Sequence, residues 1–91
     1  MGRIQCEPDA VREFMRNLQQ FQGETRDRLL AVRGQLQDMS SSSWKDDRQK
    51  QFQDLFEDME KQLMVNLDVI ESEHVPFLND VIQRAEDYLN S

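Results

Sequence analysis

A serine-rich break between two helix-like halves constrains the fold of this chain more than any other feature. Four consecutive serines, at positions 40–43, precede Trp44, the sole tryptophan of the 91 residues. Serine hydroxyls compete with the backbone for hydrogen bonds, so such a run favours a turn over a continuing helix. Ser43 and Asp46 have the spacing of a capping box, with Asp in place of Glu. The sequence therefore predicts a bend at 40–44 and a second helix that starts at Trp44.

Apolar residues on both sides of the break recur at steps of three and four residues, which is the spacing of helices packed as a coiled coil. The first helix is predicted over residues 8–39, with Pro8 at its first position. The second is predicted over residues 44–75. We expect the stripes of the two helices to supply the interface residues: Val11, Phe14, Leu18, Phe21, Leu29, Val32, Phe56, Met59, Leu63, Leu67 and Ile70.

Pro76 interrupts the second helix, because proline lacks a backbone N–H and disfavours helical geometry at the preceding residue. The spans 8–39 and 44–75 are equal in length, so the first helix is expected to offer no partner surface beyond Pro76. A broad apolar face nevertheless continues over residues 77–89. It includes Phe77, Val81 and Tyr88. We therefore expect a helical extension that follows a kink and packs on another surface, such as a second chain.

Charge and hydropathy limit the classes of partner. The net charge is -7, which argues against binding to nucleic acid or to an anionic membrane surface. No apolar run approaches the roughly 20 residues that span a bilayer, so membrane insertion is not expected. Residues 1–6 form a predicted tail without the hydrophobic core of a signal peptide. The expected location is the cytoplasm, or outside the cell if the protein is exported by a leaderless route.

The sequence lacks the residue patterns of an active site. Cys6 and His74 are the sole cysteine and histidine, and no HxxxH or CxxC spacing occurs. Glycine-rich phosphate loops and the GxSxG motif are also absent. We predict that the protein is not an enzyme and that it has no catalytic, cofactor-binding or metal-binding residues.

Two antiparallel helices bury only one stripe each, and a single domain of 91 residues is near the size at which a monomer struggles to bury enough surface. Side-by-side pairing of two hairpins into a four-helix bundle supplies the missing burial. The predicted partner is a second copy, a related helical hairpin or a larger effector. Two chains of charge -7 repel each other, so a basic heterologous partner is an alternative to the homodimer.

The bend also carries a family resemblance. Trp44 and Phe52 are eight residues apart. A tryptophan at the bend of a hairpin of this length, with an aromatic eight residues later, resembles the WXG (ESAT-like) family of helical hairpins associated with bacterial type VII secretion. The family pattern also has Gly two residues after the Trp and a small residue four after it, where this chain has Asp46 and Arg48. The resemblance implies a dimeric four-helix bundle that acts as a small secretion substrate or as the escort of a larger effector.

A second family feature is met in part. Many secretion substrates of this family carry a Tyr that is followed four residues later by Asp or Glu, as part of the export signal. Tyr88 matches the Tyr, but the sequence given ends at Ser91, three residues later, so the acidic residue of the pattern is not met in it. A cytosolic structural or adaptor bundle is therefore the alternative hypothesis. A third hypothesis, an acidic mimic that inhibits a nucleic-acid-binding protein, is based on the charge alone.

Overall fold

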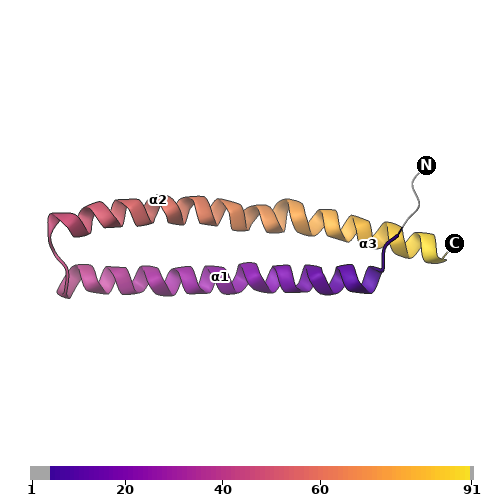
Figure 1. The fold of residues 1–91 in the computed structure, drawn as a ribbon, viewed down its shortest axis with the longest axis horizontal. Helices are drawn as coiled ribbons and strands as arrows, with labels where there is room; N and C mark the ends of the chain where they lie inside the picture. The colour runs from indigo at the N-terminus through magenta and orange to yellow at the C-terminus, as the bar shows by residue number, and fades with distance from the viewer. Residues whose placement is uncertain (1–4, 91) are drawn as a thin grey trace. The chain divides into compact units, whose positions relative to one another are not determined.

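The computed structural model describes residues 5–90, which are helical apart from a short leading segment and one bend (Figure 1). The helices are α1 (Pro8–Ser42), α2 (Asp47–Val69), the π-helix η1 (Ile70–His74) and α3 (Val75–Asn90). Most of the tail predicted at residues 1–6 lies outside the described residues. The structure confirms the all-α helical-hairpin fold class; the dimeric bundle and the single-domain organisation over 1–91 stay predictions.

The chain divides into two compact units. The bend unit is Gly23–Leu67, and the terminal unit combines the residues up to Gln22 with those from Asp68 onward. In the bend unit, the second part of α1 and α2 lie side by side and run in opposite directions (Figure 1). Its core is a cluster of buried Leu29, Leu36 and Phe56, against which Leu63 and Met64 pack. The step of seven residues from Leu29 to Leu36 is about two helical turns, so both side chains face α2.

The serines of the break extend α1 instead of ending it. The hydroxyl of Ser40 donates to the carbonyl of Gln37 at 2.7 Å, and those of Ser41 and Ser42 each donate to the carbonyl of Asp38 at 2.9 Å. These bonds run back to residues three or four positions earlier, an arrangement that is compatible with helical backbone. α1 consequently ends at Ser42 rather than at the predicted position 39.

α2 begins at Asp47 rather than at the predicted Trp44. Asp46 is the N-cap, because its Oδ1 accepts the backbone N–H of Gln49 at 3.0 Å. The hydroxyl of Ser43 instead lies 3.3 Å from that of Ser42. The predicted capping box of Ser43 and Asp46 is therefore corrected to a cap made by Asp46 itself, three residues further along the chain.

The terminal unit pairs the first part of α1 with η1 and α3. The guanidinium of Arg12 donates to Glu86 Oε1 at 2.6 Å, and the side-chain amide of Gln22 donates to Glu71 Oε1 at 2.8 Å. The expectation that the first helix offers no partner surface beyond Pro76 was therefore wrong. α1 ends later and α2 starts later than predicted, so each residue of α1 faces a partner further along the chain than the length comparison assumed.

The helix continues through Pro76 by widening in the turn before it. The backbone N–H of Val75 donates to the carbonyl of Ile70, five residues earlier, and Val75 has helical φ and ψ of -62° and -47°. A π-helical turn shifts the carbonyls by one residue, which suits a following proline that has no N–H and whose ring clashes with the carbonyl four residues earlier. The irregularity expected near Pro76 is thus η1, and the non-helical geometry expected at Val75 is absent.

Candidate interaction surfaces

Trp44 joins the bend to the core of the bend unit through a row of aromatic rings. Its ring centroid is 6.0 Å from that of Phe52, and Phe52 is 6.5 Å from the buried Phe56. Both centroid distances are within the range of favourable aromatic contacts, and the rings of each pair are tilted by 34°. The backbone N–H of Trp44 also donates to the carbonyl of Met39 at 2.8 Å. The predicted pair of Trp44 and Phe52 is brought together, although Trp44 precedes α2 instead of starting it.

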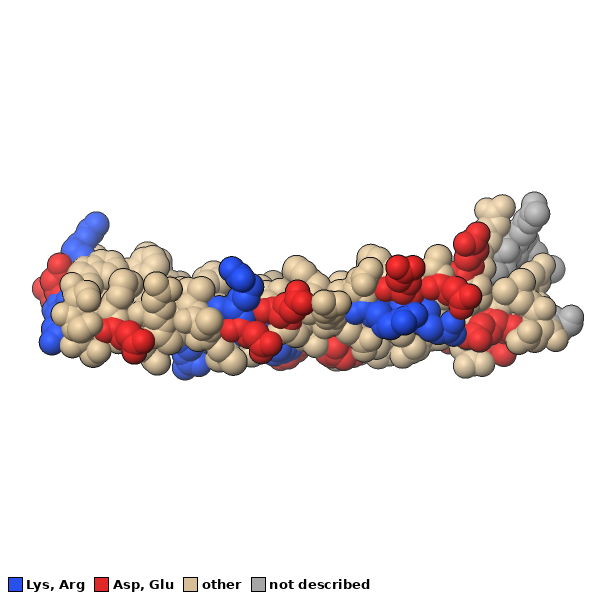
Figure 2. All heavy atoms as spheres, turned by 90° about the horizontal axis from the view of Figure 1, so that it is seen from below, with Lys and Arg blue, Asp and Glu red and all other residues tan. Residues whose placement is uncertain are grey.

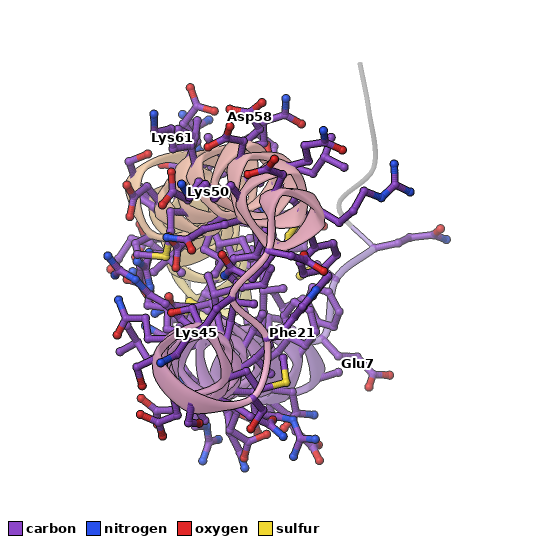
Figure 3. The ribbon with its side chains drawn as sticks, turned by 90° about the vertical axis from the view of Figure 1, so that its left-hand side faces the viewer. Glu7, Phe21, Lys45, Lys50, Asp58 and Lys61 are labelled. Carbon is purple, nitrogen blue, oxygen red and sulfur yellow. The ribbon has the colours of Figure 1, made fainter. Side chains whose placement is uncertain are left out.

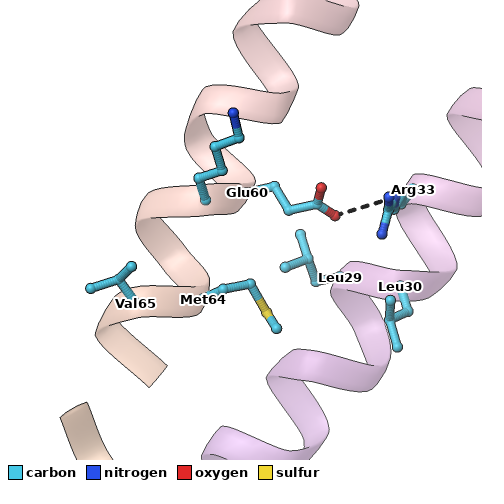
Figure 4. Close-up of a pocket in the computed structure, with 7 residues that line it drawn as sticks. Leu29, Leu30, Arg33, Glu60, Met64 and Val65 are labelled. Carbon is cyan, nitrogen blue, oxygen red and sulfur yellow. Dashed lines mark ion pairs between the residues drawn. The ribbon is translucent and has the colours of Figure 1, made fainter. Parts of the chain in front are cut away.

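The packed pair of helices in the bend unit has two sides, which we call flanks, and they carry different residues. Leu29 of α1 and Phe56 of α2 point into the core, so the residue four positions after each lies about 40° to one side. Those residues are Arg33 and Glu60, and Arg33 Nε lies 3.7 Å from Glu60 Oε2 (Figure 4). The residue three positions after each lies about 60° to the opposite side. Val32 and Met59 therefore share the other flank.

That other flank carries exposed apolar side chains, and we call it the pairing flank. Its members are Val32, Met39, Phe52 and Met59, because Met39 and Phe52 each lie seven residues from Val32 or Met59 on the same helix. Val32 is 50% exposed, Phe52 and Met59 are 43% exposed and Met39 is 36% exposed. A row of half-exposed apolar side chains at heptad spacing is typical of a helix surface that packs against another helix.

The predicted interface residues divide into three groups by burial. Buried are Leu29, Phe56, Leu67 and Ile70; half-buried are Val11, Leu18 and Leu63; exposed are Phe14, Phe21, Val32 and Met59. Residues at the three-four spacing are thus of two kinds. Some are buried between the helices of one unit, and others are exposed.

The terminal unit has its own apolar surface. Phe14, Leu18, His74, Phe77 and Leu78 line an open hollow of about 350 Å³. Phe14 and Phe77 are 57% and 70% exposed, whereas Leu18 and Leu78 are half-buried. Of the other residues predicted in the C-terminal extension, Val81 is half-buried and Tyr88 is exposed. This surface is apolar apart from the imidazole of His74.

Sequence reasoning missed two buried residues, Val75 and Gln49. Val75 of α3 is buried in the terminal unit, as are Ile82 and Ala85 of the apolar face predicted over residues 77–89, and the seven-residue step from Val75 to Ile82 could have signalled Val75. Gln49 is 4% exposed, and its amide donates to Gln53 Oε1 at 2.9 Å. A glutamine in a seam of apolar residues gives no signal of burial unless its hydrogen-bond partner is known.

On the face that Figure 2 shows, charged side chains of both signs are mixed. In the bend unit, Asp58 and Lys61 point away from α1 (Figure 3). Over residues 5–90, no three His, Cys, Asp or Glu side chains are grouped so that they could hold a metal ion. Within the same range, no helix has the length and apolar character needed to cross a membrane.

Residues 3–72 match the family model WXG100, described as proteins of 100 residues with WXG. The chain belongs to the WXG100 family. This family comprises small, non-enzymatic proteins that are secreted by a leaderless route through type VII secretion. Comparisons with curated proteins and with solved structures found no match.

The bend explains how a WXG100 protein can depart from the family motif. Asp46 occupies the position of the Gly in WXG, and this position is the N-cap of α2. N-caps accept both Asp and Gly, and Asp stabilises the helix more because its side chain accepts a backbone N–H. No non-glycine residue among those described has a positive φ, so Asp46 is not strained there. Arg48, at the small-residue position, is exposed and therefore displaces nothing in this unit.

Proposed function

We propose that this WXG100 protein is a non-enzymatic protein–protein interaction module of a type VII-like secretion system, either a small substrate or the escort of a larger effector. In this proposal it works as one half of a pair of helical hairpins. The observation that supports this proposal is the exposure of apolar side chains on the pairing flank. Its members are all more than a third exposed: Val32 and Met39 of α1, and Phe52 and Met59 of α2.

A second hairpin is the natural cover for this flank. Helices pack on helices by placing apolar side chains between those of the neighbour, and two hairpins packed side by side form a four-helix bundle. α1 repeats the seven-residue spacing in the terminal unit, where Phe14 and Phe21 are 57% and 56% exposed. Burial of these side chains on pairing would contribute stability that one hairpin alone does not have.

The partner is either a second copy or a related helical hairpin. Pairing of two copies brings together two chains of charge -7. Salt screens this repulsion over a Debye length of about 10 Å at 0.1 M, so a homodimer is expected to strengthen as salt is added. A complex with a basic partner is expected to weaken under the same conditions.

A charge placed on the pairing flank tests the proposal. Met59→Asp puts a carboxylate into the proposed interface, where burial without a partner is costly, and we expect pairing to weaken about 100-fold. Leu30→Asp is the matched control, because Leu30 is 56% exposed and lies on the flank of Arg33. The measurement is the mass in solution across a dilution series, with helix content checked by circular dichroism. Equal pairing of Met59→Asp and the unmodified protein would contradict the proposal.

A further inference from the structure

The flank of the bend unit opposite the pairing flank contains an apolar hollow. Leu29, Leu30, Met64 and Val65 line it, together with Arg33, Glu60 and Lys61, and its volume is about 490 Å³ (Figure 4). Leu29 is 7% exposed and belongs to the core, whereas Leu30 and Val65 are 56% and 62% exposed. The hollow thus has an apolar floor that is continuous with the core and exposed apolar walls contributed by both helices.

This hollow is separate from the surface that the pairing proposal uses. Arg33 and Glu60 lie four positions after the core residues of their helices, whereas Val32 and Met59 lie three positions after them. A partner on the pairing flank consequently leaves the hollow open. The two surfaces can be occupied at the same time.

The charges around the hollow are unlike those of the chain as a whole. The bend unit has nine acidic and seven basic residues, but the hollow is lined by two basic side chains and one carboxylate. That carboxylate, Glu60, is 15% exposed and pairs with Arg33 at 3.7 Å. Among residues 5–90, Lys61 has no ion-pair partner. The unbalanced charge among the side chains that line the hollow is therefore positive.

We propose that this hollow binds an acidic amphipathic helix of another protein. A third helix lying in the groove between α1 and α2 would place two apolar side chains, one turn apart, over Leu29 and between Leu30 and Val65. Lys61 lies at the α2 edge of the hollow and its side chain points away from α1 (Figure 3), so a carboxylate on the side of the bound helix nearer α2 would pair with it, and this positive site favours acidic over basic partners. The inference goes beyond the proposed pairing and does not depend on it.

Two synthetic peptides of about fourteen residues test this inference with the full-length protein. Both peptides carry leucines four residues apart on one helical face. The other positions of that face are all Glu in the first peptide and all Lys in the second. We expect the Glu peptide to bind at least about tenfold more tightly than the Lys peptide, measured by fluorescence anisotropy at 0.1 M salt. Equal binding of the two peptides, or no binding of the Glu peptide up to about 1 mM, would overturn the proposal.

Substitutions then locate the binding site. Leu30→Gln and Val65→Gln remove apolar walls that are already more than half exposed, so the fold is preserved and binding of the Glu peptide should weaken about tenfold. Leu55→Gln is the matched control, because Leu55 is 67% exposed on α2 and does not line the hollow. Lys61→Glu should reduce the preference for the Glu peptide. Equal loss of binding in Leu55→Gln and Leu30→Gln would overturn the assignment, and the mass in solution of Leu30→Gln reports separately on pairing.

Discussion

At the residue scale, the bend depends on which side chains bond to the two helix ends. The sequence correctly located the interruption at the serines and Trp44, but it placed the helix ends about three residues too early. Serine can either stop a helix or bond back to a carbonyl within it, and only the geometry of Ser40–Ser42 shows that it does the second here. Asp46 could likewise serve as N-cap or first-turn residue on sequence grounds alone.

The cap at Asp46 gives a prediction about the family motif. Asp46→Ala removes the acceptor for the N–H of Gln49 and should lower the free energy of unfolding by about 1 kcal/mol. Asp46→Gly, which restores the family residue, should cost only a few tenths of a kcal/mol relative to Asp. Urea unfolding followed by circular dichroism at one fixed protein concentration measures both.

Asp47→Ala serves as the control for this pair, because Asp47 is exposed at the first position of α2 and lies outside the cap. If Asp46→Ala were no less stable than Asp47→Ala, the side chain of Asp46 would not be the cap.

At the scale of the helices, periodicity identified the apolar residues but not their neighbours. The spacing is three or four residues for those that close a hairpin unit, such as Leu29 and Leu36, and also for those that face outward, such as Val32 and Met39. Residues three and four positions after a core residue lie on opposite flanks of the helix pair. The contact between Arg33 and Glu60 was needed to tell which residues share a flank. The place of α3 beside α1 could not be predicted for a related reason. It depends on where the helices end at the bend, and on η1, whose π-helical turn contains one more residue than an α-helical turn.

The extra residue in η1 predicts how the protein responds to deletions. In a Pro76→Ala background, deletion of Ser72 should convert η1 to regular α-helix and keep Ile82 and Ala85 facing α1, at a cost within about 1 kcal/mol. Deletion of Asn79 in the same background rotates the residues after it by about 100° and should cost several kcal/mol. Thermal unfolding by circular dichroism at a fixed protein concentration distinguishes the two deletions.

Both deleted residues, Ser72 and Asn79, are exposed, so neither removes a core side chain. Equal destabilisation by the two deletions would mean that η1 does not hold the extra residue that separates the two phases of the helix.

At the scale of the whole molecule, this small acidic WXG100 protein leaves many large apolar side chains exposed, and we propose that a partner covers them. The sequence predicted the need for a partner from chain length and from the narrow stripe that each helix buries. The sequence could not identify which apolar residues a partner would cover, because the exposure of each depends on which apolar residues pack against one another within each unit. The structure supplies that division and leaves Phe52 and Met59 exposed on one flank of the bend unit.

Pairing is best measured by the mass in solution of the purified chain, from light scattering on a sizing column, together with circular dichroism of the same sample. Pairing of two copies predicts a helical species of twice the chain mass of 10.8 kDa. Dependence on a related hairpin predicts a poorly folded single chain that becomes helical when that hairpin is added. A stable, fully helical single chain that unfolds cooperatively at a concentration of about 0.1 mM would contradict the claim that the pairing flank requires a partner.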